Sequence, residues 1–317
     1  MRNTLTMLMC GAVLALGACK KKGTTGGGGG GWFVGTEGLM VNLEPGSDAT
    51  TAYDLGETEQ LTTIACRYQA EAWVGGAKGT LLYTSDAGDE WVSHALPTTA
   101  DLHAIATQDT GPVFLAGDGV FLTATPAFVT GDATWTDLGD GITKFRSVSA
   151  ARRGETVLAV SDDGGVWSYE GGRLVNRTTI AGADAIAVSA DGRTVLLAGA
   201  GLSRSTDGGH SWTTLAVDPG VRFADVRIDD RGEGFAVGSA GAIARVDTDG
   251  RVLLQRAGTA DLQTLFVPYS SAWDGVGYAA GDGGQIWLTH DAGWTWEIGP
   301  NVGRTVLGVD EIGDAHR

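Results

Sequence analysis

Short apolar segments alternate with glycine-containing turns along the chain from residue 32 onward. Seven of these segments end in Ala or Val followed by Gly or Ser: Trp32–Gly35, Trp73–Gly75, Phe114–Gly117, Leu158–Ser161, Leu197–Gly199, Phe235–Gly238 and Tyr278–Gly281. They recur about every 40 residues, with no helical pattern between them. Short strands at this spacing are typical of a β-propeller of four-stranded blades, so the pattern predicts an all-β, seven-bladed propeller.

Each repeat contains four expected strands, and the segments above are the second of them. An innermost strand precedes each of the last six segments: 61–66, 102–106, 145–149, 185–189, 223–228 and 262–267. A third strand follows a glycine turn, as in 80–83 and 285–288. Large and small residues alternate within these strands, as expected for sheets that pack on both faces.

Three turns that precede an expected fourth strand share one spacing of Ser or Thr, Asp, Gly and Trp. They are Thr84-x-Asp86-x-Gly88-x-x-Trp91, Ser205-x-Asp207-x-Gly209-x-x-Trp212 and Thr289-x-Asp291-x-Gly293-x-x-Trp296. A hydroxyl and a carboxylate can accept hydrogen bonds from turn N–H groups, and an indole can pack between sheets. The turns resemble the Asp-box, also called the BNR repeat, in which these residues are structural. We expect each fourth strand to begin at the tryptophan.

The two ends of the repeat region are complementary. Trp32 opens directly on a second strand, whereas residues 304–310 have the pattern of an innermost strand with nothing after it. Pairing of this C-terminal strand with Trp32-Phe33-Val34 would close the ring and cover both sheet edges. We therefore expect Val306 and Val34 to lie in one sheet.

The chain carries a net charge of -16, and beyond residue 22 its lysines are Lys78 and Lys144. Such a charge repels nucleic-acid phosphates, so nucleic-acid binding is not expected. The apolar content of 43% excludes a disordered chain. Composition therefore favours a globular all-β protein, which we expect to be a monomer.

The N-terminal 18 residues have the features of a secretion signal. An apolar run over residues 5–16 is too short to cross a bilayer and leads into Leu16-Gly17-Ala18-Cys19. This sequence resembles the lipobox of bacterial lipoproteins, and the resemblance implies a lipid on Cys19. We expect a signal peptide at 1–18, a lipidated Lys- and Gly-rich tether at 19–31 and the propeller at 32–317. Lys20 after the cysteine favours the outer membrane by the same resemblance.

Cys66 is the one cysteine expected to be free in the mature chain, which excludes an internal disulfide. It lies in an apolar strand and is expected to be a buried core residue. His103 and His210 lack paired ligand spacing, so the sequence predicts neither a metal site nor a cofactor.

Residues 32–317 resemble Asp-box propellers of the photosystem II stability/assembly factor-like family, most closely at 205–212 and 277–296. The resemblance implies a propeller that acts in protein assembly, because members of that family contact a membrane protein through basic residues on one face. This chain differs in its acidic charge and in its expected lipid anchor. The resemblance therefore implies the fold but not a photosystem partner.

Sialidases and some endoglucanases also carry Asp-boxes on propellers, so a glycoside hydrolase is the alternative. Hydrolysis would need a carboxylate pair at the channel mouth, where the loops before the innermost strands should converge. The Arg-Ile-Pro sequence typical of sialidases is absent. The candidate binding face at this mouth comprises Asp101, Asp140, Lys144, Arg146, Asp184, Arg222, Asp261 and Arg304. We expect these residues to bind a protein of the cell envelope without catalysis, from a lipid-anchored position.

Overall fold

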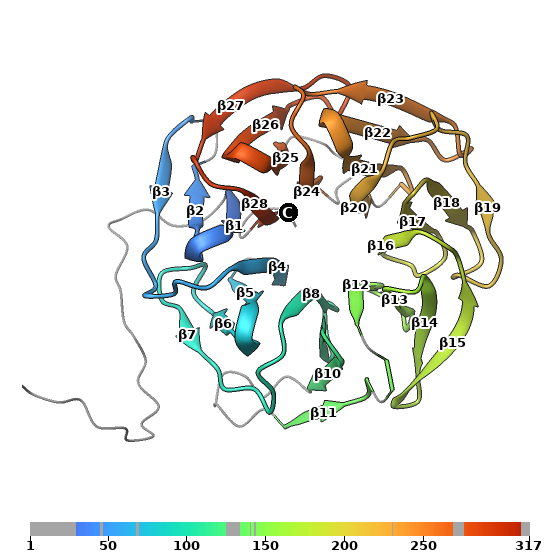
Figure 1. Cartoon of the computed structure of the whole chain (residues 1–317), viewed down its shortest axis with the longest axis horizontal. Helices are drawn as coiled ribbons and strands as arrows, with labels where there is room; N and C mark the ends of the chain where they lie inside the picture. Colours follow the sequence, from blue (N-terminus) through green and yellow to red (C-terminus); the bar gives the residue numbers. More distant parts are fainter. Residues whose placement is uncertain are drawn as a thin grey trace, which may run out of the picture.

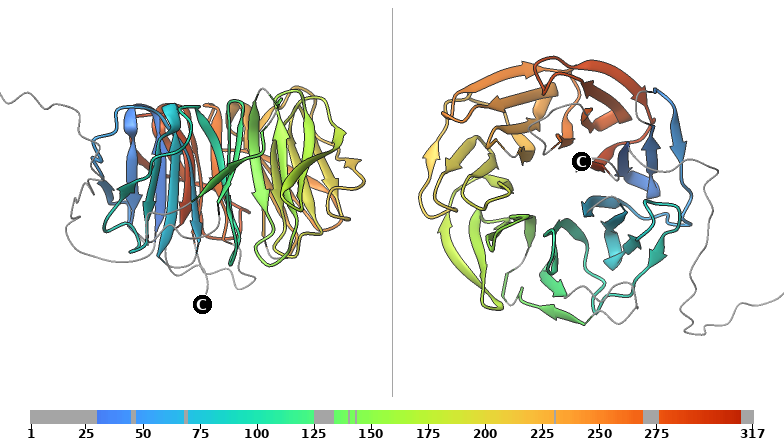
Figure 2. Two further views of the ribbon diagram at one scale, coloured as in Figure 1. Left: turned by 90° about the horizontal axis from the view of Figure 1, so that it is seen from below. Right: turned by 180° about the vertical axis from the view of Figure 1, so that it is seen from behind.

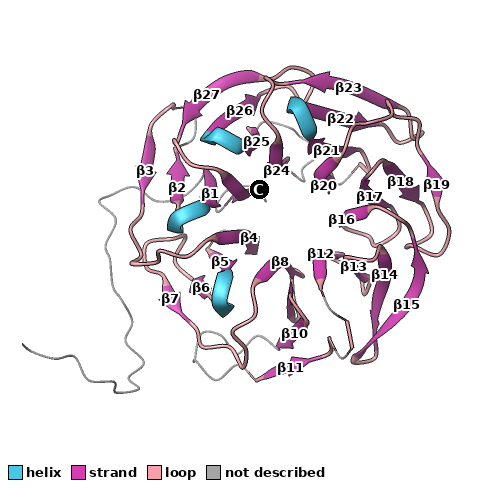
Figure 3. Ribbon diagram, in the orientation of Figure 1, coloured by secondary structure: helices cyan, strands magenta, loops and turns pink. Residues whose placement is uncertain are grey.

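The computed structural model describes residues 30–44, 47–67, 70–124, 134–139, 141–142, 144–229, 231–268 and 276–311. These residues form seven four-stranded antiparallel sheets arranged around a central axis (Figure 1). The predicted all-β, seven-bladed propeller is confirmed. Among the described residues the helical segments are four 3₁₀ turns (Figure 3): η1 (Thr36–Gly38), η2 (Ala77–Gly79), η4 (Ser239–Gly241) and η5 (Asp282–Gly284). No helix in this part of the chain has the length and apolarity needed to span a membrane.

The innermost strands surround the axis. In the order of blades 1 to 7 they are β28 (Val306–Glu311), β4 (Leu61–Arg67), β8 (Leu102–Thr107), β12 (Phe145–Ala150), β16 (Ala183–Val188), β20 (Phe223–Ile228) and β24 (Leu262–Phe266). The second strands are β1 (Gly31–Gly35), β5 (Glu71–Gly76), β9 (Val113–Gly117), β13 (Val157–Ser161), β17 (Val195–Gly199), β21 (Gly234–Gly238) and β25 (Gly277–Gly281).

The outer half of each blade is shorter or more exposed. The third strands are β2 (Met40–Leu43), β6 (Leu81–Thr84), β10 (Val120–Ala124), β14 (Gly165–Glu170), β18 (Leu202–Ser205), β22 (Ala242–Val246) and β26 (Gln285–Thr289). The fourth strands are β3 (Thr50–Ala52), β7 (Val92–Ser93), β11 (Trp135–Asp137), β15 (Arg173–Thr179), β19 (Thr213–Thr214), β23 (Val252–Arg256) and β27 (Glu297–Asn301). Strands β7, β19 and β27 each begin one residue after the tryptophan rather than at it, because the indole still belongs to the turn.

Blade 1 combines the two ends of the described chain. Strand β28 pairs antiparallel with β1, and this register places Val34 opposite Gly308 and Gly35 opposite Val306. Val306 and Val309 are fully buried. The predicted closure is therefore confirmed, and it leaves no unpaired edge on β1.

The core is divided among the junctions between blades. Seven hydrophobic clusters are present, and each joins residues of two neighbouring sheets. The second strands carry much of this core, since five residues in a row are buried in every one of them. A strand buried on both faces explains the continuous apolar runs that recur in the sequence.

The alternating strand directions define two faces, which Figure 2 shows from the side as the two ends of the ring. We call the end where the innermost strands begin the entry face and the end where they finish the exit face. The turns between third and fourth strands lie at the exit face. The described chain also starts there, because Gly31 at the beginning of β1 pairs with Glu311 at the end of β28.

The three turns Thr84–Trp91, Ser205–Trp212 and Thr289–Trp296, called box turns below, repeat one hydrogen-bond pattern. In the second of them the Ser205 hydroxyl donates to Asp207 Oδ1 at 2.7 Å and accepts the Gly209 N–H at 2.8 Å. The Ser211 N–H donates to Asp207 Oδ1 at 2.9 Å. The corresponding bonds of the other two turns have lengths of 2.7 to 3.0 Å. The spacing in the sequence thus corresponds to one turn geometry.

Candidate functional site

The entry end of every innermost strand contains a β-bulge. In each sheet the register skips the second residue of the innermost strand, so that this residue has no partner on the second strand. A bulge redirects the side chain of the extra residue. The seven skipped residues, called the entry ring, are Thr62, His103, Arg146, Asp184, Ala224, Gln263 and Leu307, and all seven line one cavity at the axis.

The repeated glycine of the sequence is linked to this bulge. It lies at the end of the second strand, where the chain that enters the innermost strand passes very close. A Cβ at Gly117 would lie 2.3 Å from the Asp101 carbonyl oxygen, and one at Gly238 would lie 2.0 Å from that of Arg222. Such distances leave no room for a side chain, which explains why six of the seven blades have glycine there. Blade 4 has Ser161 at this position and keeps the bulge. This glycine was the sequence signal that could have located the entry ring.

The cavity enclosed by the entry ring has a volume of about 480 Å³. The entry ring has polar residues in blades 2, 3, 4, 5 and 7 and apolar residues in blade 6 (Ala224) and blade 1 (Leu307). Counting the ring, the charged residues that line the cavity are Lys144, Arg146, Arg222 and Arg227 and the carboxylates Asp184, Asp225 and Asp261. The protein as a whole has a net charge of -16. The cavity is therefore much less acidic than the remaining surface.

An ion-pair group joins three blades on one side of the cavity. Asp184 lies between Arg146, whose Nε is 3.5 Å from Asp184 Oδ1, and Arg222, which donates an Nη–H to Asp184 Oδ2. The Asp184 side chain is 14% exposed and the Arg222 side chain is 56% exposed. The carboxylate is thus held inside the ring, while the Arg222 guanidinium still faces solvent.

A second polar group lies where blades 3 and 4 meet. Asp118 follows β9, and its Oδ1 is 2.8 Å from His103 Nε2 and 3.2 Å from Lys144 Nζ. Partial burial raises the pKa of the Asp118 carboxyl, but the hydrogen bonds from His103 and Lys144 outweigh this effect and leave the pKa below its usual value. Asp118 is therefore a carboxylate at neutral pH and fixes both neighbours at the mouth.

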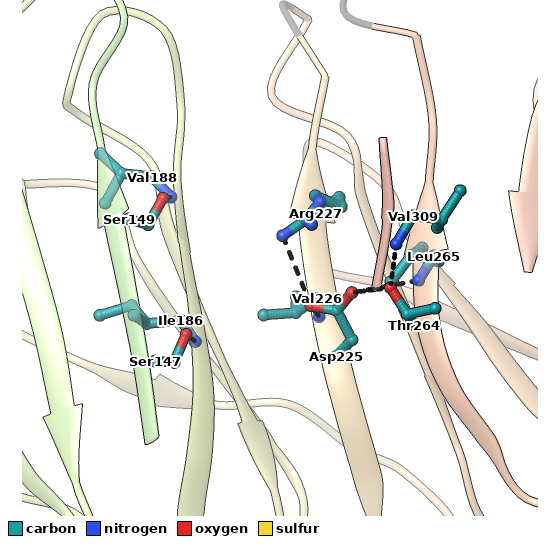
Figure 4. Close-up of polar contacts among 10 residues, drawn as sticks. All are labelled: Ser147, Ser149, Ile186, Val188, Asp225, Val226, Arg227, Thr264, Leu265 and Val309. Atoms are coloured by element: carbon teal, nitrogen blue, oxygen red, sulfur yellow. Dashed lines mark hydrogen bonds and ion pairs between the residues drawn. The ribbon is translucent and has the colours of Figure 1, made fainter. Parts of the chain in front are cut away.

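Deeper in the channel, side chains of one innermost strand accept backbone N–H groups of the next (Figure 4). Ser147 and Ser149 on β12 accept from Ile186 and Val188 on β16, at 3.2 and 3.0 Å. Asp225 Oδ2 on β20 accepts from Leu265 at 3.1 Å. In the same way Thr264 on β24 accepts the Val309 N–H of β28 at 3.2 Å. These bonds connect neighbouring blades along the channel wall.

A second, smaller cavity of about 70 Å³ lies at the exit end of the channel. It shares Arg227 with the entry cavity and is also lined by Cys66 and Asp310. The Cys66 N–H donates to Asp310 Oδ2 at 2.8 Å. Burial raises the pKa of the Cys66 thiol, and the Asp310 carboxyl raises it further. The thiol therefore stays protonated at neutral pH, which is the opposite of what a nucleophilic cysteine requires.

The structure distributes the residues of the predicted binding face unequally. Lys144, Arg146, Asp184, Arg222 and Asp261 line the entry cavity together. Asp101 instead accepts the Lys78 N–H at 2.8 Å, and Arg304 donates to the Glu37 carbonyl oxygen at 3.2 Å. Both of these therefore stabilise turns at the rim of the face. Asp140 and Cys19 lie outside the described residues.

Sequence reasoning missed five members of the entry ring, because it selected Asp, Lys and Arg near the starts of the innermost strands and none of the five is one of these residues. Thr62, His103, Ala224, Gln263 and Leu307 belong to the strands themselves, where alternation alone does not reveal which side chains face the axis. The bulge changes their direction by one position.

The carboxylates of the cavity are engaged by the protein's own groups. Asp184 binds two arginines, Asp225 accepts the Leu265 N–H, and Asp261 accepts the Ala240 N–H at 2.8 Å. Within the described ranges no three His, Cys, Asp or Glu side chains lie close enough together to hold a metal ion. The arrangement offers hydrogen-bonding groups of both signs around a cavity, which suits binding of a polar segment.

No protein-family model matches the chain, and no curated protein sequence matches it. Solved structures do match. YCF48 from Cyanidioschyzon merolae has a TM-score of 0.61 at 16% identity, covering 78% of this chain and 87% of its own. A structure described as YCF48 bound to D1 peptide has a TM-score of 0.58 at 16% identity, covering 76% and 81%.

The WD40 β-propeller domain of Doa1 has a TM-score of 0.63 at 17% identity, covering 80% of this chain and 86% of its own. At such low identities the similarity shows a shared propeller fold and nothing about the ligand.

Proposed function

We propose that this protein is a lipid-anchored bacterial envelope protein whose propeller binds a protein segment in the entry cavity, without catalysis. The entry ring is the observation that carries the proposal. Its seven positions share one backbone geometry but differ in chemistry, so the frame is constant while the contacts are specific. Recognition surfaces on rigid repeat scaffolds have this property.

Three further observations support this proposal. The cavity carboxylates are bound to arginines or backbone N–H groups, which favours binding over proton transfer to a substrate. One similar propeller is described as bound to a peptide. The Leu16-Gly17-Ala18-Cys19 sequence supports lipid attachment at Cys19, and hence a position at the cell envelope, in the outer membrane by the same resemblance.

Site-specific photo-crosslinking in intact cells tests the proposal. A photoreactive amino acid at Gln263 reports on the entry ring, and one at Thr214 on the outer strand β19 is the matched control. We expect Gln263 to give a crosslink to one envelope protein that Thr214 does not give. The Arg146→Ala and Arg222→Ala substitutions together should abolish that crosslink. The cooperative unfolding transition should persist at a lower melting temperature, because Asp184 loses both cationic partners. Equal crosslinks from both positions, or retention of the crosslink in the double variant, would exclude the entry cavity.

Catalysis is tested separately with the purified full chain. Sialosides and β-glucans should remain intact after prolonged incubation with it. Hydrolysis that disappears on an Asp→Asn change at position 184, 225 or 261 would contradict the non-catalytic assignment.

A further inference from the structure

Large exposed apolar side chains are concentrated in one place on the propeller. In the described part of the chain they are Trp294, Ile298 and Leu253, which are 55%, 70% and 46% exposed. Trp294 belongs to the box turn of blade 7, Ile298 to β27 of the same blade and Leu253 to β23 of blade 6. We call these three residues the exit-rim patch.

All three residues lie at the exit end of the junction between blades 6 and 7. Fourth strands start at the exit face, and Leu253 and Ile298 are each the second residue of such a strand. Ile298 lies opposite Trp287, which packs against the core of that junction. Leu253 lies opposite Arg245. Directly opposed residues of antiparallel strands share one side of a sheet, so the patch surrounds the same junction.

Trp294 is held in position rather than left free to turn. Its ring stacks on the Arg245 guanidinium, 3.9 Å from the centroid, and Arg245 is itself bonded to Glu233 at 2.6 Å. Gln255 Nε2 donates to the Gly293 carbonyl oxygen at 2.8 Å and fixes the turn on blade 6. A fixed, half-exposed indole beside a cation is suited to a boundary between water and an apolar phase.

The patch lies on the same face of the ring as the point where the expected lipid anchor joins the propeller. Strand β1 begins at Gly31 on the exit face of blade 1, and blade 1 is the neighbour of blade 7 in the closed ring (Figure 1). From Cys19 to Gly30 the sequence has eleven steps, which can extend to at most about 40 Å. The entry end of β1 is about 17 Å from Gly31, the length of its five residues.

We infer that the exit-rim patch rests on the lipid surface, so that the entry cavity faces away from the membrane. This inference depends on the lipid anchor of the proposed function and goes beyond it. The partner segment then reaches the cavity from the aqueous side rather than from within the bilayer. The two turns that carry the patch contain Asp247, Asp249 and Asp291, and the chain has a net charge of -16. We therefore expect the contact to be apolar and to favour zwitterionic over anionic lipid.

Quenching by lipid headgroups tests this orientation. The lipidated mature protein, which begins at Cys19, is reconstituted into phosphatidylcholine vesicles that contain a nitroxide-headgroup lipid. A fluorescent label is attached to a cysteine at Asp249 on the exit face or at Asp218 on the entry face, in a Cys66→Ser background. Both aspartates are exposed and belong to blade 6: Asp218 precedes its innermost strand β20, and Asp249 precedes its outer strand β23. The two positions are therefore matched in charge and in blade. We expect several-fold stronger quenching at position 249.

The patch itself is tested by Trp294→Ala combined with Ile298→Ser. This double variant should lose most of the quenching difference between positions 249 and 218. Asp89→Ala is the control, because Asp89 has the position of Trp294 in the box turn of blade 2, the other neighbour of blade 1. It should leave the difference unchanged, and so should an increase in salt concentration.

The outcomes separate this inference from the anchor. Protein that fails to float with the vesicles, or lacks the lipid mass on Cys19, would refute the anchor and the orientation with it. Protein that floats but is quenched equally at both positions, or more at 218, would refute the orientation alone. Concentration-dependent dimers that the double variant abolishes would assign the patch to a second copy of the chain and overturn the inference.

Discussion

The entry ring and the box turns lie at opposite ends of the blades. They differ in whether the side chains or the backbone geometry is repeated from blade to blade. In the box turns of blades 2, 5 and 7 the side chains repeat, and they form the same hydrogen bonds. In the entry ring the backbone bulge repeats, while the side chains range from Ala224 to Arg146. The box turns use their polar groups internally, whereas the ring presents its groups to the channel. Repetition of side chains therefore marks architecture here, and variation on a repeated backbone marks the candidate site.

Removal of residues 303–317 has the largest expected effect, because it removes the frame on which both regions depend. The deletion takes away β28 with the fully buried Val306 and Val309, and exposes the edge of β1. We expect no cooperative unfolding transition in a thermal melt followed by circular dichroism. A transition that is unchanged from the full chain would show that closure by β28 is dispensable.

Substitution of a box-turn tryptophan comes next. Trp91 is 5% exposed and packs against Trp32 with ring centroids 5.7 Å apart. Trp91→Ala should lower the free energy of unfolding by about 3–5 kcal/mol, measured by urea denaturation. Trp212→Ala should cost less, since that indole is only partly buried. Gln263→Ala in the entry ring is the matched comparison and should stay within about 0.5 kcal/mol of the parent. A larger loss at Gln263 than at Trp91 would reverse the contrast between the regions.

The stability that the box turn of blade 5 gains from the Asp207 carboxylate should depend on pH. Hydrogen bonds from Ser211 and Ser205 hold the pKa of Asp207 well below its usual value of 3.8. A depressed folded pKa contributes stability above the unfolded pKa, and this stability is lost as the pH falls toward the folded value. Asp207→Asn should therefore be less stable than the parent at neutral pH, and the difference should shrink below about pH 4.

Urea midpoints at neutral and acidic pH measure this difference. Asp218→Asn, at an exposed loop aspartate of the entry face, is the control and should match the parent at both values. A deficit of Asp207→Asn that is independent of pH would show that its charge has no part in the turn.

The smallest effect concerns one position inside the box turns. Ala292 has a φ of 59°, whereas the equivalent residue in blade 5 is Gly208 with a φ of 72°. Glycine avoids the strain of this left-handed conformation but loses more entropy on folding. Ala292→Gly should thus stabilise the protein by about 0.5–1 kcal/mol in urea denaturation. Gly208→Ala should change stability in the opposite direction, and two changes of the same sign would contradict the explanation.

The sequence predicted a large part of the fold because a propeller blade is encoded locally. A recurring apolar segment that ends in glycine, and a turn with fixed Asp and Trp spacing, each specify structure within a few residues. The ring closure could also be predicted, because no second strand follows residues 304–310 and no innermost strand precedes Trp32. The pairing of β28 with β1 supplies both missing neighbours.

The sequence by itself determined the number of blades, the closing strand and the turn chemistry, because these depend on residues that are neighbours in the chain or repeat at a fixed interval. The tertiary structure alone decided which side chains face the axis. Thr62 and Gln263 enter the cavity because a bulge shifts their register, and Arg146 and Arg222 meet at Asp184 because blades 4, 5 and 6 pack side by side. Strand register and contacts between blades arise only when the sheets pack, so the pattern of apolar and polar residues could not predict them.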